Sequence, residues 1–236
     1  MLLIEGNNLV EAACQADYKP DIIFYTEGWQ QKHQPLCQII ADLGVRVELV
    51  SPEVLKAIAT TVNPDGVVAI APYSDIPPQS AIIKGVGIGL ERLQDPGNLG
   101  TIIRTAAATK VETLWLSPES VDFYSPKVLR ASAGEWFRLP VVTNQNLGQL
   151  VKEQRQQGVQ IIATTSKATK TCWEIDFTRP SLILLGNEGA GLSPELIALA
   201  DVQLKIPLAN QVESLNVAVA TALILYEAQR QVATSN

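Results

Sequence analysis

The sequence predicts an α/β protein with two domains, the second of them built on a parallel sheet. Short apolar runs rich in β-branched residues alternate with helix-like segments along the 236 residues. A proline-rich stretch, APYSDIPPQS at 71–80, interrupts this alternation. Beyond it, apolar strands separated by helices are typical of a parallel sheet covered on both faces. We therefore expect a small α/β domain over 1–73, a linker over 74–81 and a larger domain over 82–236.

The first domain is expected to alternate helices and strands. Its helices are expected at 9–16, 34–44 and 51–59, and its strands at 21–26, 45–50 and 66–71. Gly44 closes the second helix, because glycine ends helices without steric cost. Ser51 and Pro52 begin the third, with the serine as N-cap and the proline at the first helical position.

The second domain continues the alternation with more strands. These are expected at 81–91, 113–117, 139–143, 159–165, 181–186 and 202–208. Helices are expected from Asn98, at 147–158, at 193–200 and from Ser214, and a further segment covers 125–137. Asn98 and Ser214 are the expected N-caps, because their side-chain oxygens can accept hydrogen bonds from first-turn N–H groups. The last helix is apolar almost all round, so we expect it to be largely buried.

Composition excludes several classes of protein. No apolar run reaches the roughly 18 residues that a membrane-spanning helix needs. Cys14, Cys37 and Cys172 have no paired spacing, which argues against a disulfide framework or zinc site and fits a reducing cytoplasm. His33 is the only histidine and is expected at the surface, so it is a poor candidate for a catalytic base.

Three loops at expected strand ends carry more glycine and polar residues than a connection needs, and ligands bind parallel sheets at this edge. The first, DPGNLGTIIRTAAAT at 95–109, contains Asn98 and Arg104. The Arg104 guanidinium can hold a phosphate or carboxylate bidentately. A structural ion pair, or a surface arginine whose stem alone is buried, explains Arg104 equally well.

The other two loops are less specific when taken alone. In LLGNEGAGLSPEL, at 184–196, glycines surround Glu188 and leave its carboxylate free to point into a site. A flexible glycine-rich turn with a solvated acid is the alternative. The third loop opens the last helix with Ser214 and Asn216, and simple capping of that helix is its alternative.

Other motifs of nucleotide enzymes are missing. GVGIGL, at 85–90, lies inside an expected strand and does not form the G-x-G-x-x-G turn of dinucleotide-binding proteins. Walker A and G-x-S-x-G patterns are also missing. A Rossmann-type enzyme that binds NAD is therefore disfavoured.

Taken together, the three loops resemble the signature motifs of the SpoU (TrmH-type) RNA 2′-O-ribose methyltransferases of the SPOUT class. The matching stretches are NLGTIIRTA, GNEGAGL and IPLANQVESLNVAVATALILYE, in the family's order and spacing, within 82–232. The first domain, opening at LIEGNNLVEAA, resembles the L30e-like substrate-binding domain that often precedes this catalytic domain.

The resemblance implies a parallel-sheet domain with a deep trefoil knot, which binds S-adenosylmethionine, and a homodimer with its active site near the interface. The implied cofactor-binding residues are Thr164, Gly186, Ile206, Leu208 and Leu215. The implied catalytic residue is Arg104, which would hold an RNA phosphate and stabilise the alkoxide that forms at the ribose. Asn98, Glu188, Ser214 and Asn216 would orient the arginine, the ribose and the cofactor, and no metal is required.

The expected partner is structured RNA in the cytoplasm, ribosomal RNA more than transfer RNA. The net charge of −6 is uneven, because residues 1–73 hold four Lys or Arg against nine Asp or Glu. RNA must therefore be met by a local basic patch. The candidates, with Arg104, are Arg92, Lys127, Arg130 and Arg138. A non-catalytic RNA-binding or ribosome-assembly factor on the same fold is the remaining alternative.

Overall fold

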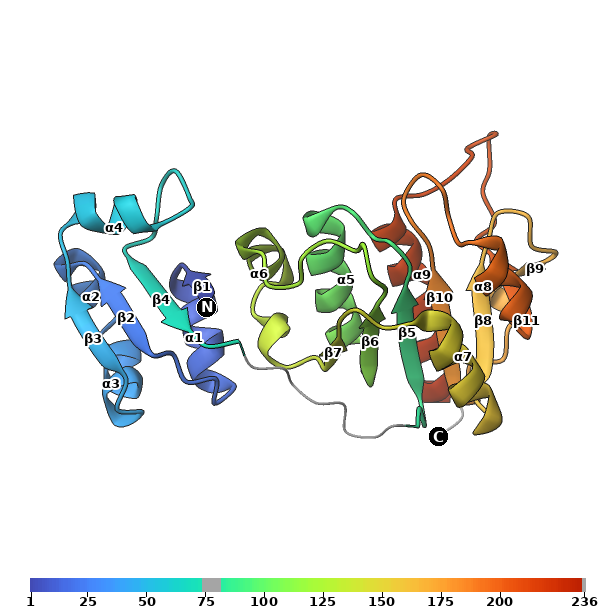
Figure 1. Ribbon diagram of the computed structural model, residues 1–236, viewed down its shortest axis with the longest axis horizontal. Coiled ribbons are helices and arrows are strands. Elements are labelled where there is room, and N and C mark those ends of the chain that lie inside the picture. The colour runs from blue at the N-terminus through green and yellow to red at the C-terminus, as the bar shows by residue number, and fades with distance from the viewer. Residues whose placement is uncertain (74–81, 235–236) are drawn as a thin grey trace.

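The computed structural model describes residues 1–73 and 82–234 and places two β-sheets next to each other (Figure 1). The linker expected at 74–81 lies outside the described residues. Within the described ranges, no helix is long and apolar enough to cross a membrane.

The first sheet contains four strands in the order β1-β4-β2-β3. The strands are β1 Leu2–Glu5, β2 Ile22–Tyr25, β3 Arg46–Leu49 and β4 Val67–Ala71, and the helices are α1 Asn7–Gln15, α2 Glu27–Lys32, α3 Gln34–Asp42 and α4 Pro52–Ile58. β4 pairs antiparallel with both β1 and β2, whereas β2 and β3 are parallel. Ser51 caps α4 by accepting from the Val54 N–H at 3.4 Å, as expected.

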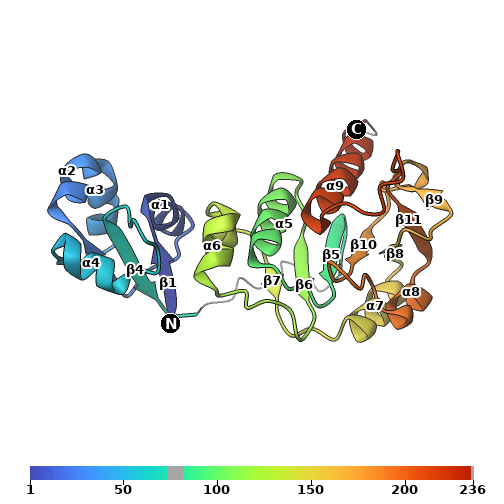
Figure 2. The same cartoon turned by 90° about the horizontal axis from the view of Figure 1, so that it is seen from above.

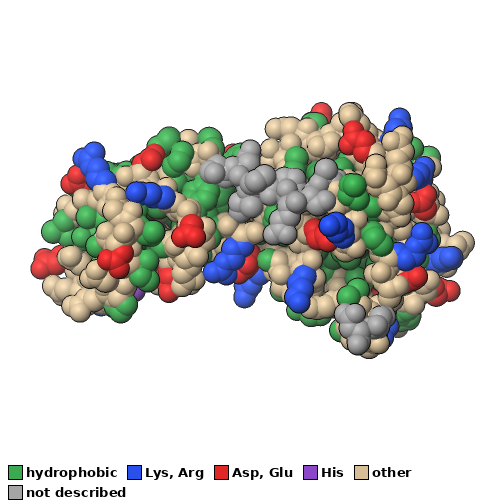
Figure 3. All heavy atoms as spheres, turned by 90° about the horizontal axis from the view of Figure 1, so that it is seen from below, with side chains coloured by type: hydrophobic (Ala, Val, Ile, Leu, Met, Phe, Trp, Pro, Cys, Tyr) green, Lys and Arg blue, Asp and Glu red, His purple; other side chains and the backbone are tan. Residues whose placement is uncertain are grey.

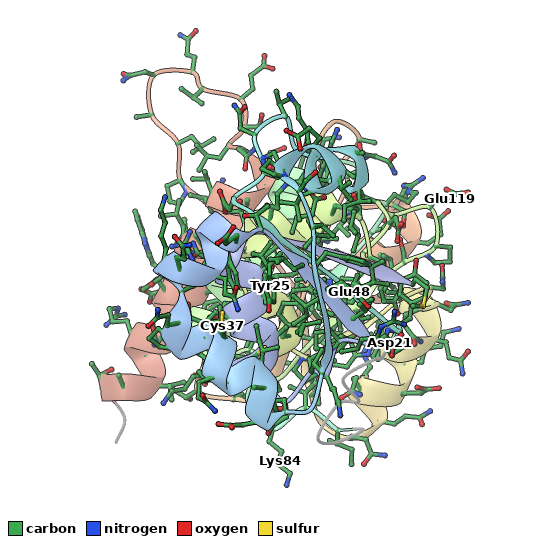
Figure 4. All side chains as sticks on the ribbon, turned by 90° about the vertical axis from the view of Figure 1, so that its left-hand side faces the viewer. Asp21, Tyr25, Cys37, Glu48, Lys84 and Glu119 are labelled. Carbon is green, nitrogen blue, oxygen red and sulfur yellow. The ribbon has the colours of Figure 1, made fainter. Side chains whose placement is uncertain are left out.

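Sequence patterns missed β1 and α2 in this part of the chain. β1 has four residues, and α2, of sequence EGWQQK, buries only Trp29. The Trp29 ring packs 5.7 Å from Tyr25 and stacks on His33 at 4.8 Å, so His33 is half-buried rather than a free surface residue. Figure 4 looks onto this end of the molecule, with Tyr25 labelled on β2 and Cys37 on α3.

The second sheet confirms the expected parallel arrangement. Its order is β7-β6-β5-β10-β8-β11-β9, and every neighbouring pair is parallel. The strands are β5 Val86–Leu90, β6 Thr113–Leu116, β7 Val141–Val142, β8 Gln160–Thr164, β9 Lys170–Thr171, β10 Ser181–Leu185 and β11 Val202–Lys205. The two-residue β9 was not predicted, because so short a strand has no periodicity.

Helices cover both faces of this sheet. They are α5 Pro96–Ala108, α6 Pro126–Ser132, α7 Leu147–Gln156, α8 Pro194–Leu199 and α9 Val217–Thr234, with 3-10 turns η1 Glu135–Phe137 and η2 Cys172–Glu174. α5, α6 and α9 lie on one face, and α7 and α8 lie on the other (Figure 2). After β11 the chain returns across the sheet to α9, which packs on α5. This path agrees with the knotted fold implied by the resemblance.

The two sheets share one hydrophobic core. Tyr18, which follows α1, meets Trp136 edge-on at 5.8 Å and Phe137 at 5.2 Å. Trp136 is 1% exposed and donates its indole N–H to the Phe123 carbonyl at 3.0 Å. Buried side chains from β1, α1, α5, α6 and α9 form a single cluster across this boundary. The two parts of the chain are therefore packed together and do not merely lie side by side.

Candidate active site

Helix α5 begins at the carboxyl edge of the second sheet, directly after β5. Asp95 is its N-cap and accepts from the Asn98 N–H at 2.7 Å, with Pro96 at the first helical position. The expectation that Asn98 caps this helix is therefore wrong. Asp95 takes the role because the proline that follows it is already fixed in helical φ. The Asn98 side chain lies in the first turn and is available for other contacts.

The loop between β10 and α8 folds back tightly on itself. Asn187 and Gly191 exchange backbone hydrogen bonds of 2.9 and 3.2 Å. The Asn187 side chain accepts from the N–H groups of Gly189 and Ala190 and donates to the Arg92 carbonyl, each at 2.9 Å. A Cβ atom on Gly186 would lie 2.0 Å from the Gly191 carbonyl carbon. Only glycine fits at position 186, because the loop returns directly over it.

Glu188 joins this loop to the start of α5. Its carboxylate accepts from the Asn98 side chain and the Asp95 N–H, both at 3.1 Å, and from the Gln94 N–H at 3.2 Å. Partial burial raises the pKa of Glu188, but the hydrogen bond from Asn98 and those from backbone amides outweigh burial and leave the pKa below its ordinary value. Glu188 is therefore an ionised anchor between two loops.

Asn216 brings the third loop to the same place. Its amide donates to the Asn98 side-chain oxygen at 2.9 Å, and its own oxygen accepts from the Ala218 N–H at 2.9 Å and the Val219 N–H at 3.3 Å. Asn216 is thus the cap of α9, which begins at Val217. The expectation of a cap at Ser214 is wrong. Ser214 is exposed and lies before the helix, and its side chain has no hydrogen bond within the described part of the chain.

Asn98, Glu188 and Asn216 therefore form one connected polar set, which we call the amide–carboxylate set. Its members come from the three motifs, and Glu188 and Asn216 lie 90 and 118 residues after Asn98 in the sequence. All three loops lie at the carboxyl edge of the parallel sheet, at the top of Figure 1. The sequence predicted each member, but not the contacts that join them.

Arg104 lies on the exposed side of α5, between Thr101 and Ala108. Its guanidinium has no hydrogen bond or ion pair among residues 1–73 and 82–234. The structure therefore does not bring Arg104 into the amide–carboxylate set, and the described residues offer no structural ion pair for it. A solvent-facing cation without a protein partner is available to an external anion.

The implied cofactor-binding residues follow three neighbouring strands of the sheet. Thr164 ends β8 and donates to the Leu184 carbonyl at 3.0 Å, and Gly186 follows β10. Ile206 and Leu208 follow β11, and Leu215 lies just before α9. Within the described residues, the backbone N–H groups of Leu208 and Leu215 have no hydrogen-bond partner. Free backbone donors at this edge fit a ligand that is held largely by backbone groups.

The four candidate RNA-binding cations differ in how closely they pair with carboxylates of the protein. Lys127, at the start of α6, is exposed and has no ion pair among the described residues. Arg92 is 43% exposed in its side chain and lies 3.9 Å from Glu91. Arg138 pairs with Glu135 at 3.3 Å, and Arg130 pairs with Glu5 at 3.2 Å. On the face drawn in Figure 3, basic and acidic side chains are interspersed.

Sequence reasoning missed Asp95 and Asn187, which shape two of the loops. The Asp-Pro pair was a usable signal for Asp95, and an asparagine between glycines was a weaker one for Asn187. Two hollows lie elsewhere, in the first part of the chain. One, of about 380 Å³, is lined by residues of α2 and α3, and the other, of about 430 Å³, by residues of α2, α4 and the segment before β4. Within the described residues, no group of three or more His, Cys, Asp and Glu could hold a metal ion.

Replacing Glu188 by Gln is expected to change how stability depends on pH. The pKa of Glu188 is lower in the folded protein than its ordinary 4.5, so its stabilising contribution is present above pH 4.5 and is lost as the pH falls through the folded value. At pH 7 the melting temperature of wild type should therefore be higher than that of Glu188→Gln, and the difference between the two should become smaller at acid pH. Melting curves from pH 7 to pH 3 measure it, and a gap that widens toward acid pH would contradict this assignment.

A parallel sheet with its three loops joined at one edge is the arrangement that the resemblance to SPOUT-class methyltransferases implies. The chain belongs to the SpoU rRNA Methylase family, whose model matches residues 85–226. A second model, RNA 2′-O ribose methyltransferase substrate binding, matches residues 3–75. Both matches confirm the resemblance on which the site residues were chosen.

Relatives match along nearly the whole chain. An uncharacterized tRNA/rRNA methyltransferase of Synechocystis is 49% identical over 98% of this chain and 84% of its own length. The 23S rRNA 2′-O-methyltransferase RlmP of Bacillus subtilis is 32% identical over 95% and 86%.

Solved structures agree with the fold. The SpoU methyltransferase AviRb of Streptomyces viridochromogenes has a TM-score of 0.84 at 30% identity, covering 100% of this chain and 91% of AviRb. An AdoMet-bound rRNA methyltransferase of Sinorhizobium meliloti has a TM-score of 0.82 at 33% identity, covering 98% and 87%. The fold expected from the sequence is confirmed.

Proposed function

We propose that this chain transfers a methyl group from S-adenosylmethionine to a ribose 2′-hydroxyl of ribosomal RNA. The observation that carries the proposal is the amide–carboxylate set, assembled from the three family motifs at the carboxyl edge of the sheet. RlmP, named for 23S rRNA, matches 95% of this chain, including the first sheet. The Escherichia coli tRNA (guanosine-2′-O)-methyltransferase matches 60%. This difference in coverage favours ribosomal RNA.

Each side chain of the site has a separate role in the proposed reaction. When bound, S-adenosylmethionine supplies an electrophilic methyl group on a sulfonium centre. Arg104, whose guanidinium carries a permanent positive charge, holds an RNA phosphate and stabilises the negative charge that develops on the 2′-oxygen. Glu188 and Asn216 fix Asn98, and the fixed set orients the ribose. The hydroxyl proton leaves to solvent as the oxygen attacks.

The residues at the ends of the strands bind the cofactor. Thr164, Gly186, Ile206, Leu208 and Leu215 hold the cofactor, chiefly through backbone groups. The catalytic group includes Ser214, which is exposed beside Leu215 and able to approach RNA.

Both parts of the chain bind the RNA. Residues 1–73 form the substrate-binding domain, 74–81 the linker and 82–236 the methyltransferase domain. Lys127 and Arg92 contact RNA phosphates, since neither is held by a close ion pair in the described residues. Arg138 contributes at the edge, where its side chain is 47% exposed. The reaction takes place in the cytoplasm, with its RNA.

The active unit is a homodimer. Val219, Leu223 and Tyr226 are 50, 47 and 56% exposed at spacings of four and three residues, which puts them on one face of α9. α9 packs beside α5, whose exposed side carries Arg104. An apolar stripe of this kind is typical of a protein–protein interface. A second copy that covers the stripe would bring Arg104 to the edge of the interface.

Replacing Tyr226 by Glu is expected to dissociate this dimer, because a carboxylate would be buried without a partner. The dimer dissociation constant should rise at least about 100-fold, which is typical of losing a central aromatic contact. Sedimentation velocity measures the change. Val62→Glu is the matched control and should leave the dimer intact. Val62 is 79% exposed and lies among residues 1–73, away from α9 in the sequence. A monomeric wild type, or an unaffected variant, would remove this interface.

Transfer of labelled methyl from S-adenosylmethionine into total RNA from cells that lack this gene tests the activity. Label in a ribosomal RNA band, released as a 2′-O-methylnucleoside, is the expected result. Label in transfer RNA would correct the substrate. Cofactor binding without label would favour the non-catalytic RNA-binding or assembly factor.

A further inference from the structure

A buried carboxylate lies where the first sheet meets the second. Glu5, the last residue of β1, is 5% exposed. It accepts from the N–H groups of Thr60 and Thr61 at 2.9 and 3.1 Å and from both of their hydroxyl groups. These bonds hold the segment between α4 and β4 against the end of β1. Glu5 thus organises the side of residues 1–73 that faces α6.

The cation that neutralises Glu5 comes from the other half of the molecule. Arg130 of α6 reaches Glu5 at 3.2 Å and donates to the Thr60 hydroxyl at 3.2 Å. Its side chain is 33% exposed, so water screens the pair only in part. Arg130 was expected to bind RNA, but the structure occupies its guanidinium with this link between the halves.

α6 also packs closely on the helix that carries Arg104. A Cβ atom on Gly100 of α5 would lie 2.3 Å from the Ala131 Cβ and 2.8 Å from the Val128 carbonyl oxygen. The two helices are therefore as close as their backbones allow, next to Arg130. A shift of α6 must move α5, because there is no free space between them. Glu5, Arg130 and the Gly100 contact make a continuous rigid connection from the first sheet to the Arg104 helix.

We propose that Glu5 and Arg130 are positioning residues. They fix the angle between residues 1–73 and the second sheet, so that RNA bound to residues 1–73 presents its ribose to Arg104. This inference rests on the proposed methyl transfer to RNA. Neither residue touches the reacting atoms. Without the link, the shared aromatic core still joins the halves, but their angle is less well defined. RNA then binds in more positions, of which fewer are productive.

Arg130→Met tests this role, with Arg155→Met as the matched control. Both arginines pair with a carboxylate, but Arg155 of α7 pairs with Asp201, at 2.9 Å, within the second part of the chain. We expect kcat for RNA methylation to fall about tenfold in Arg130→Met, within the range known for residues that couple distant sites. The affinity for S-adenosylmethionine, measured by calorimetry, should stay within about twofold, since Arg130 lies away from the cofactor loops.

Three further measurements separate positioning from damage to the fold. Arg130→Lys keeps the charge beside Glu5 and should recover most of the lost kcat. Small-angle X-ray scattering should show a larger maximum dimension for Arg130→Met than for wild type or Arg155→Met. Melting curves report whether each variant is folded at the assay temperature.

Each outcome decides between the claims. An unchanged kcat in folded Arg130→Met, an equal loss in Arg155→Met, or a loss of cofactor affinity in Arg130→Met would overturn the positioning role and leave the proposed function standing. An absence of methyl transfer by wild type would overturn the proposed function, and the positioning role with it.

Discussion

Arg104→Ala is expected to abolish methyl transfer to RNA and to leave the affinity for S-adenosylmethionine within about threefold, because the two depend on separate groups. Removing a single donor that stabilises a developing oxyanion typically lowers kcat about 100- to 1,000-fold. Arg104 also holds the RNA phosphate, so we expect at least the upper figure. Single-turnover transfer of labelled methyl with saturating cofactor measures the loss directly.

The fold should not suffer from this change. Arg104 is exposed on α5 and has no protein partner in the described residues, and such surface substitutions usually alter stability by less than about 0.5 kcal/mol. Lys152→Ala, at an exposed cation of α7 on the opposite face of the sheet, is the matched control. Turnover within tenfold of wild type in Arg104→Ala would remove Arg104 from the catalytic group.

Gly186→Val is expected to prevent cofactor binding. A side chain at this position would lie 2.0 Å from the Gly191 carbonyl carbon and 2.1 Å from the Leu192 nitrogen, so the loop must open. Opening would separate Asn187 from Gly191 and pull Glu188 away from Asn98. The cause is a collision of the valine side chain with the loop's own backbone.

The size of the effect follows from the loss of the loop's shape. We expect the cofactor affinity to fall at least about 30-fold, which corresponds to about 2 kcal/mol, with a loss of about 1–3 kcal/mol in unfolding free energy from the forced fit. Gly189→Val is the matched control, because a Cβ there meets only the Asn187 Oδ1, at 3.6 Å. Isothermal titration calorimetry compares the two. Equal affinities would show that the shape of this loop does not matter for the cofactor.

Hydrophobic periodicity was sufficient to predict most of the helices and strands. It failed where an element was too short or too polar to have a period, as in β9 and α2. Caps were harder to predict, because several residues before each helix can accept the same hydrogen bonds. The structure selects Asp95 and Asn216 over Asn98 and Ser214. In each case the selected residue directly precedes the helix, and the tertiary contacts of Asn98 use the side chain that was expected to cap.

The candidate site could be predicted as a set of residues but not as a geometry. Family motifs identified Asn98, Glu188 and Asn216, which the structure joins by hydrogen bonds. The strand order brings the three loops together, and local hydrophobic periodicity does not predict it. The same is true of the pairing of Glu5 with Arg130, which are 125 residues apart. Long-range contacts of this kind depend on the packing of whole layers, and so Arg130 was expected to bind RNA.

The aromatic contact of Tyr18 with Trp136 has a consequence for how the chain folds and evolves. An apolar core that both parts of the chain share joins them into one cooperative unit, whereas a boundary without such a core would let each part open alone. A substitution that loosens α1 therefore lowers the population of intact methyltransferase sites far away from it. Selection acting on the chemistry also preserves the packing of the first 73 residues, even at positions that never meet RNA.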